Sequence, residues 1–191
     1  MKKLYLIIIL YGIIFVGFSQ EKDAWTEDFE TEGGSDYYTG NVIVNGRTWS
    51  AKDAGNFDYG ASTMGTIAFV INDDKFGAHI TSPALNTCGT VSFKYAYRSG
   101  NSSNVFKLQY STDGSSFTDL DTHTLGASAN VSYVNYSYSV NINSAIVYIR
   151  ILSDNQDAHL FIDDYQVTNY SGGVVDPSDF TASSSSISEI D

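Results

Sequence analysis

Residues 91–98, which read VSFKYAYR, decide the fold class of this chain. Valine or an aromatic residue occupies every second position, and serine, lysine, alanine and arginine occupy the positions between them. Successive side chains of a strand point to opposite faces, so this period of two predicts a strand with one face in a core. Residues 105–110 and 133–140 repeat the pattern. The sequence around position 91 therefore predicts a β-sheet protein.

Turn signals and further apolar runs extend the prediction along the chain. Residues 111–116, STDGSS, carry the Asp-Gly pair that is typical of a tight hairpin. Residues 146–152 are apolar apart from Arg150, which predicts a strand covered on both faces. Many short strands with such turns predict an antiparallel sandwich or barrel. The other strands are expected at 25–30, 66–71, 79–85 and 160–168. Long loops are expected at 33–40 and 52–64, separated by a piece around 42–49.

The N-terminus has the pattern of a signal peptide. Lys2 and Lys3 precede an apolar run at 4–18, and Gly17 and Ser19 put small residues at the cleavage positions. The run is too short for a comfortable membrane span, and no second one follows. We therefore predict that residues 1–19 are removed, that the protein is secreted or held at the cell surface, and that it does not insert into a membrane.

The rest of the chain divides into one domain and a tail. Residues 20–170 have the length of one ordinary domain, and 171–176 form a linker that begins with Ser-Gly-Gly. Residues 177–191 resemble the first strand of a fibronectin type III-like module that is cut short. Their serine content is also compatible with a disordered tail.

Charge and cysteine content restrict the partners and the stabilising bonds. The formal net charge is −12, which argues against nucleic acid or an anionic membrane as a partner and favours bound cations. Cys88 is the single cysteine, so an internal disulfide is impossible. The fold must be held by its hydrophobic core, or by a metal ion.

Motifs for catalysis are missing. His79, His123 and His159 are scattered without metal-ligand spacing, and no G-x-S-x-G nucleophile motif occurs. Cys88, before a predicted strand, has the setting of an inert, apolar cysteine. We therefore predict no catalytic residue and expect that this segment is not an enzyme.

Four short motifs, in this order, carry a family resemblance. They are DFE at 28–30, Trp49, SPAL at 82–85 and FIDD at 161–164. The set resembles the MAM-like and cleaved-adhesin-like jelly rolls of secreted bacterial (Bacteroidetes-type) multidomain proteins. The resemblance implies an all-β, antiparallel jelly-roll β-sandwich of the galactose-binding and MAM-like type, attached without catalytic function to a larger exported protein.

The first and last strands carry four carboxylates that predict a metal site. Asp28 and Glu30 lie on one face of the first strand, and either Asp163 or Asp164 can join them from the last. Calcium takes six to eight hard oxygen ligands, and clustered carboxylates would repel one another without a cation. The resemblance implies a structural calcium at the same place. Alternatively, these residues are exposed acids at strand ends.

Aromatic residues in the early loops are candidates for ligand binding. Tyr37, Tyr38, Trp49 and Tyr59 lie in or beside the two long loops, where binding residues are often found on β scaffolds. Sugars stack their C–H faces on such rings, so the expected ligand is a glycan, or else a cell-surface protein. Alternatively, Trp49 anchors its loop on the core.

Three functions follow from these observations. The first is a non-catalytic extracellular binding or adhesion module, directed at carbohydrate. The second is a calcium-stabilised structural spacer. The third is an N-terminal accessory domain of an exported hydrolase or nuclease, in which the partners include downstream domains of the same polypeptide.

Overall fold

A computed structural model describes residues 24–30, 36–57, 67–72, 75–99, 105–125, 130–154 and 158–172. The predicted signal peptide, the end of the predicted linker, the 177–191 segment and Tyr59 lie outside these residues. The described part contains no helix of the length and hydropathy needed to cross a membrane.

Every regular element of the described chain is a β-strand, and all pairings are antiparallel. The strands are β1 (Trp25–Glu27), β2 (Tyr38–Val44), β3 (Arg47–Phe57), β4 (Ala68–Ile71), β5 (His79–Thr81), β6 (Cys88–Ser99), β7 (Val105–Ser111), β8 (Thr118–Thr124), β9 (Asn130–Ile142), β10 (Tyr148–Ser153) and β11 (Ala158–Val167).

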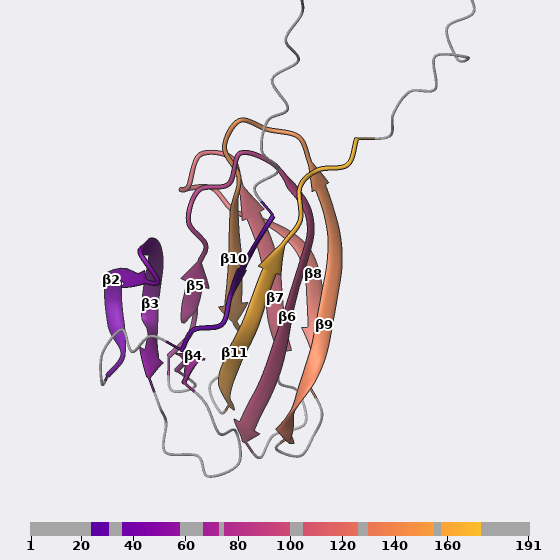
Figure 1. Cartoon of the computed structure of the whole chain (residues 1–191). Coiled ribbons are helices and arrows are strands. Elements are labelled where there is room, and N and C mark those ends of the chain that lie inside the picture. Colours follow the sequence, from indigo (N-terminus) through magenta and orange to yellow (C-terminus); the bar gives the residue numbers. More distant parts are fainter. Residues whose placement is uncertain are drawn as a thin grey trace, which may run out of the picture.

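The strands form two layers that share β3 (Figure 1). One layer runs β8-β7-β10-β5-β3, and β2 pairs with the free edge of β3. The other runs β4-β11-β6-β9, with β1 also beside β11. The start of β3 pairs with β5 and its end with β4. Between these halves Asp53 has a left-handed φ of 48°, at the point where the strand passes from one sheet to the other. This architecture confirms the jelly-roll sandwich.

The core fills the space between the two sheets. Its largest fully buried side chains come from both layers, as the alternation at 91–98 predicts: Trp49, Tyr165, Phe29, Phe69, Phe106, Ile71, Ile80, Leu108, Ile149, Ile151, Leu160 and Ile162. Trp49 is central, with ring centroids 5.2 Å from both Phe29 and Tyr165. Edge-to-face packing of this kind adds to the hydrophobic stabilisation.

Several predictions need correction. The strand expected at 25–30 ends at Glu27, and the loop expected at 33–40 is wrong from Tyr38, where β2 begins. The loop expected at 52–64 is wrong over 52–57, which continue β3. The strand β8 was not predicted, because its sequence TDLDTHT is polar and shows no apolar alternation. The strand β10 is not covered on both faces: Ile149 and Ile151 point inward, whereas Tyr148 and Arg150 are only half-buried.

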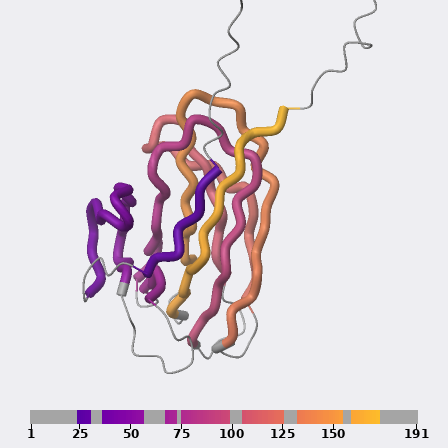
Figure 2. Tube along the Cα trace, viewed as in Figure 1, coloured from indigo at the N-terminus to yellow at the C-terminus, as the bar shows by residue number. Residues whose placement is uncertain are grey.

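The first and last strands meet, as predicted. Trp25 pairs with Val167 and Glu27 with Tyr165. Figure 2 shows β1 beside β11 at the edge of the second sheet. This pairing brings the DFE motif near the FIDD motif.

Candidate functional site

A row of polar side chains crosses the outer face of the first sheet. The register aligns one residue from each of six neighbouring strands, and none of the six is aliphatic or aromatic. In order they are Asn41, Ser50, Thr81, Arg150, Gln109 and Asp119. Aligned residues in a sheet point to the same face. The row therefore makes a continuous band of hydrogen-bonding groups from β2 to β8.

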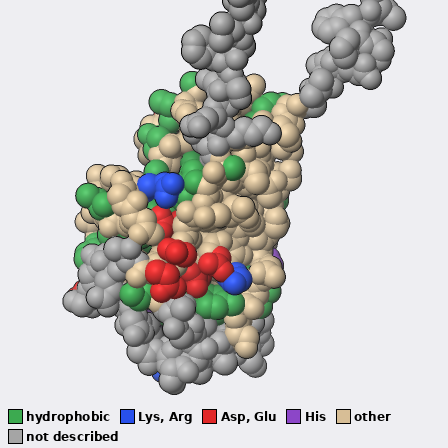
Figure 3. All heavy atoms as spheres, in the orientation of Figure 1, with side chains coloured by type: hydrophobic (Ala, Val, Ile, Leu, Met, Phe, Trp, Pro, Cys, Tyr) green, Lys and Arg blue, Asp and Glu red, His purple; other side chains and the backbone are tan. Residues whose placement is uncertain are grey.

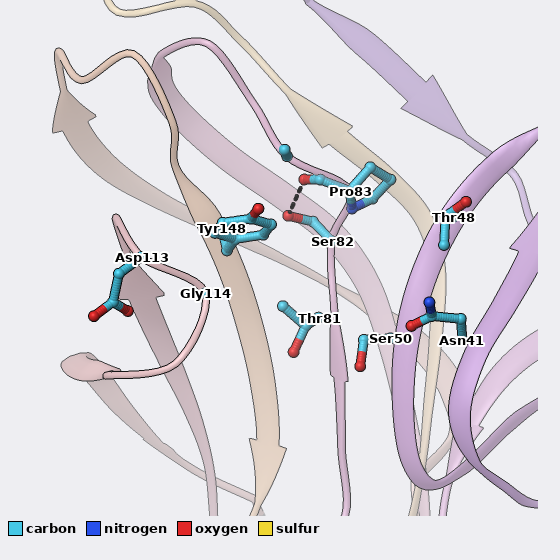
Figure 4. Close-up of a pocket in the computed structure, with 10 residues that line it drawn as sticks. Asn41, Thr48, Ser50, Thr81, Ser82, Pro83, Asp113, Gly114 and Tyr148 are labelled. Atoms are coloured by element: carbon cyan, nitrogen blue, oxygen red, sulfur yellow. Dashed lines mark hydrogen bonds between the residues drawn. The ribbon is translucent and has the colours of Figure 1, made fainter.

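A groove of roughly 390 Å³ lies along one part of this face. Figure 4 shows residues of the β2–β3 hairpin on one side, the end of β5 in the middle, and Tyr148 with the β7–β8 turn on the other. The groove is lined by Asn41, Thr48, Ser50, Thr81, Ser82, Pro83, Ala84, Asp113, Gly114 and Tyr148. Hydroxyl and amide groups outnumber aliphatic ones in this lining, in keeping with a polar ligand.

The hairpin side of the groove has open hydrogen-bonding groups. The side chains of Asn41, Thr48 and Ser50 are exposed and make no hydrogen bond to another described residue. The middle is held more firmly, because Ser82 Oγ donates to the carbonyl of Pro83 at 2.9 Å and accepts the N–H of Ile149 at 3.0 Å. The groove thus combines a fixed floor with a wall of free donors and acceptors.

The β7–β8 turn forms the opposite wall and positions Tyr148. Gly114 has a φ of 73°, and a Cβ there would lie 3.2 Å from Tyr148 Cε2, so the ring rests against the turn. Asp113 Oδ1 accepts the N–H groups of Ser116 and Ser115 at 2.7 and 2.8 Å. These two bonds hold the pKa of Asp113 well below its usual range. Asp113 therefore stabilises the turn as a charged group.

Arg150 lies at the centre of the polar row. Its guanidinium carbon is 3.4 Å from the centroid of the Phe117 ring, and its Nε donates to Thr81 Oγ1 at 3.2 Å. Stacking on an aromatic ring and one fixed hydrogen bond restrict the orientation of the guanidinium plane. Burial lowers the pKa of Arg150.

The predicted ligand-binding residues that the structure describes lie outside the groove. Trp49 as a sugar platform is wrong: it is 1% exposed, because its strand points this side chain into the core and the next one, Ser50, into the groove. Tyr37 and Tyr38 are half-buried, and Tyr37 packs against the outer face of the second sheet, with its ring 6.1 Å from that of His159.

The predicted calcium residues lie near the junction of β1 and β11. Asp28 and Glu30 are exposed, while Asp163 is 6% exposed and accepts the N–H of Asp164 at 2.8 Å. Asp164 is exposed and forms an ion pair with Lys94. Figure 3 shows acidic side chains gathered on this face of the molecule. The described residues contain no group of three or more histidine, cysteine or acidic side chains that could hold a metal ion.

A fifth carboxylate at this junction was not predicted from the sequence. Glu27 is 1% exposed and lies 3.7 Å from Arg47 Nη1, and its Oε1 accepts hydrogen bonds from Asn45 Nδ2 and from the N–H of Phe29. Its Oε2 is buried with no hydrogen-bond partner among the described residues. Burial is the main cause that raises the pKa of Glu27.

Other titratable groups named from the sequence have structural roles. Cys88 is fully buried, and burial raises the pKa of its thiol to about 12, so the thiolate form is disfavoured at neutral pH. His123 Nε2 and Tyr95 Oη are 2.9 Å apart between the two layers.

One sequence signal could have located the groove. Arg150 interrupts an apolar run, and a charged residue in a strand with buried neighbours must point to the opposite face. Alternation around Arg150 then places Tyr148 on the same face as Arg150. The residues of β2, β3 and β7 that share this face could not be identified from the sequence, because their alignment with Arg150 depends on the strand register.

Comparison with solved structures identifies the same fold in bacterial adhesins. The K2 cleaved adhesin domain of Lys-gingipain has 17% identity and a TM-score of 0.51, over 76% of this chain and 98% of that domain. The K3 domain from Porphyromonas gingivalis W83 has 14% identity and a TM-score of 0.51, over 78% and 99%. No protein-family model and no curated protein matches the sequence. The chain therefore has the jelly-roll fold of these cleaved adhesin domains, and at such identities the likeness is one of fold alone.

Proposed function

We propose that this chain is an extracellular, non-catalytic module that binds a glycan in the groove between the β2–β3 hairpin and Tyr148. The observation that carries the proposal is the pairing of a half-buried tyrosine ring with open amide and hydroxyl groups across one groove. A sugar offers C–H faces for the ring and hydroxyls for the polar wall. The signal-peptide pattern at 1–19 supports action outside the cell.

The groove chemistry favours binding over hydrolysis. Most glycoside hydrolases use two carboxylates that flank the scissile bond. Asp113 is the single acidic residue among those that line the groove, and its Oδ1 is engaged by the turn. The described lining therefore holds and orients a ligand without supplying an acid–base pair.

Binding to a panel of soluble and insoluble polysaccharides tests this function. We expect Tyr148→Ala to weaken binding about tenfold or more, because the ring loses its stacking contact. Tyr37→Ala and Tyr38→Ala are matched controls, since these tyrosines are also half-buried but lie outside the groove. Circular dichroism and thermal melting would verify that all three variants are folded.

The controls also separate the groove from the early loops. If Tyr37→Ala or Tyr38→Ala abolishes binding and Tyr148→Ala does not, the glycan binds at the aromatic residues of the early loops and not in the groove. If no polysaccharide binds, a spacer role or a protein partner replaces the glycan.

We also propose a structural calcium ion at the junction of β1 and β11. Asp28, Glu30 and Asp163 are the candidate ligands, while Asp164 is occupied by Lys94. These three side chains would have to move together around the ion, because they do not form a metal-binding group in the structure as described. Glu27 Oε2, buried beside Asp28, lies 3.7 Å from Arg47 Nη1 but accepts no hydrogen bond from a described residue. A further cation at this junction would offset the missing hydrogen bond, which supports the proposal. Calcium would supply oxygen coordination that links the first strand to the last.

Thermal melting with and without calcium tests this site. EDTA should lower the melting temperature, and added calcium should restore it, because a ligand that binds the folded state stabilises it. Glu30→Gln should reduce the calcium effect, whereas Asp119→Asn, on β8, should not. A melting temperature that does not respond to EDTA in the unaltered protein would exclude a stabilising calcium.

A further inference from the structure

Several basic side chains lie on the outer face of the first sheet in a chain of net charge −12. Arg150 lies in the polar row, and Lys52 pairs with His79 in the next row. Burial is the main cause that lowers the pKa of His79, and the charges of Arg150 and Lys52 lower it further, while nearby Asp53 opposes them. These three basic side chains are therefore close enough to interact.

Two of these cations have no carboxylate partner in the described part of the chain. Arg47, Lys94 and Lys107 each lie within 4.0 Å of an acidic oxygen, whereas Arg150 and Lys52 do not. The acid nearest to Arg150 along the row is Asp119, separated from it by Gln109.

That acid is already engaged, because Asp119 accepts a hydrogen bond from Gln109 Nε2 at 2.6 Å and lies 3.6 Å from Lys107 Nζ. No described carboxylate lies within 4.0 Å of the guanidinium of Arg150. Partial burial of a cation without a carboxylate in contact carries a desolvation penalty. An anionic ligand bound to Arg150 would offset this penalty.

The donors of Arg150 are prearranged for an oxyanion. Phe117 holds the face of the guanidinium and Thr81 accepts from Nε, so the two terminal nitrogens make no hydrogen bond to a described residue. A fixed guanidinium fork matches the two oxygens of a carboxylate or a sulfate. Its orientation is set before a ligand arrives, which reduces the entropy lost on binding.

An acceptor beside Arg150 is also unsatisfied. Gln109 is its register partner, and Gln109 Oε1 is buried with no hydrogen-bond partner among the described residues. A ligand that carries an anionic group and a neighbouring hydroxyl would satisfy both residues at once. Acidic sugars carry this combination, whereas simple anions and neutral sugars offer one half of it.

We propose that Arg150 binds the carboxylate or sulfate group of an acidic sugar, with Gln109 accepting a hydrogen bond from an adjacent hydroxyl. The inference rests on the proposed glycan-binding function and names the class of glycan. The negative net charge of the protein does not prevent an anionic sugar from binding at Arg150. Salt screens the acidic side chains that lie more than about 8 Å away at physiological ionic strength.

Matched polymers that differ only in charge test this inference. Polygalacturonate carries free carboxylates, its methyl ester is the neutral counterpart, and a sulfated galactan with its desulfated form tests sulfate. The unaltered protein should bind one charged polymer about 10- to 100-fold more tightly than its neutral counterpart. The two pairs show whether the anion is a carboxylate or a sulfate.

Variants then assign the preference to Arg150. Arg150→Gln should remove the preference for the charged polymer, and Arg150→Lys should retain part of it. Lys107→Gln is the matched control, because it removes one positive charge from the same sheet at a residue that already pairs with Asp119 and Asp154. It should leave the preference unchanged.

The outcomes separate this inference from the proposed function. Equal binding of charged and neutral polymers by the unaltered protein overturns the acidic-sugar inference and leaves glycan binding intact. A charge preference that survives in folded Arg150→Gln also overturns it. Absence of binding to every polymer overturns both. If Arg150→Gln does not fold, the charged and neutral pairs on the unaltered protein still decide whether the site prefers an anion.

Discussion

Trp49 and Tyr148 are both aromatic residues on strands of the first sheet, yet they have opposite roles. Trp49 is 1% exposed and contacts the rings of Trp25, Phe29 and Tyr165. Tyr148 is half-buried and lines the groove. The difference arises from the face to which each strand position points. Residue type alone therefore does not distinguish an aromatic core residue from an aromatic binding residue.

The two surroundings also differ in how accessible they are to a ligand. The aromatic cluster around Trp49 is closed, so its stabilisation comes from apolar burial and ring packing. The groove leaves the side chains of Asn41 and Ser50 open. Farther along the same polar row, Gln109 Oε1 has no hydrogen-bond partner among the described residues. Substitutions in the first region should change stability, and substitutions in the second should change binding.

The largest expected effect is that of Trp49→Ala. Removing this buried ring should reduce the free energy of unfolding by about 3–5 kcal/mol, because it leaves a cavity at the centre of the core. Urea denaturation followed by circular dichroism measures the loss. Tyr148→Ala is the control and should cost less than about 1.5 kcal/mol, since its ring lies on the outer face. Equal losses in the two variants would contradict the division between core and groove.

A smaller effect is expected from Glu27→Gln, and it should depend on pH. Burial raises the pKa of Glu27 in the folded state above its value in the unfolded chain. Its contribution to stability is therefore fully present below the unfolded pKa and is lost as pH rises through the folded pKa. Glutamine cannot ionise, so the variant should gain stability relative to the unaltered protein as pH rises from about 4 to neutral.

Urea denaturation at several pH values, with EDTA present to remove calcium, measures this gain. Glu30→Gln is the matched control, because Glu30 is exposed and close in sequence. A difference between Glu27→Gln and the unaltered protein that is independent of pH would show that Glu27 titrates normally in the folded state.

Local sequence was sufficient for several elements of the fold. The alternation at 91–98 correctly predicts a strand there, and the Asp-Gly pair correctly predicts the β7–β8 turn. The pairing of the first and last strands was also correctly predicted, but from the general closure of a sandwich and not from local sequence. The strand and the turn were predicted for a different reason. These features succeed because periodicity and turn chemistry depend on residues that are adjacent in the chain.

Other elements could not be predicted from local sequence. The strand β8 has no apolar face to reveal it, and β3 continues through Asp53, whose left-handed conformation falls within a stretch expected to be a loop. Of the aromatic residues predicted to bind ligand, Trp49 is in the core, and Tyr37 and Tyr38 are not among the residues that line the groove. Tertiary pairing overrides local preference at these positions.

The sequence by itself determined the fold class, the alternation of buried and exposed side chains, and the single unpaired cysteine. The tertiary structure alone decided which residues share the groove. Asn41, Thr81 and Tyr148 are distant in the chain, and antiparallel pairing through β3, β5 and β10 brings them to one face. The physical reason is that strand register sets which side chains are neighbours, and register depends on the packing of the whole sandwich.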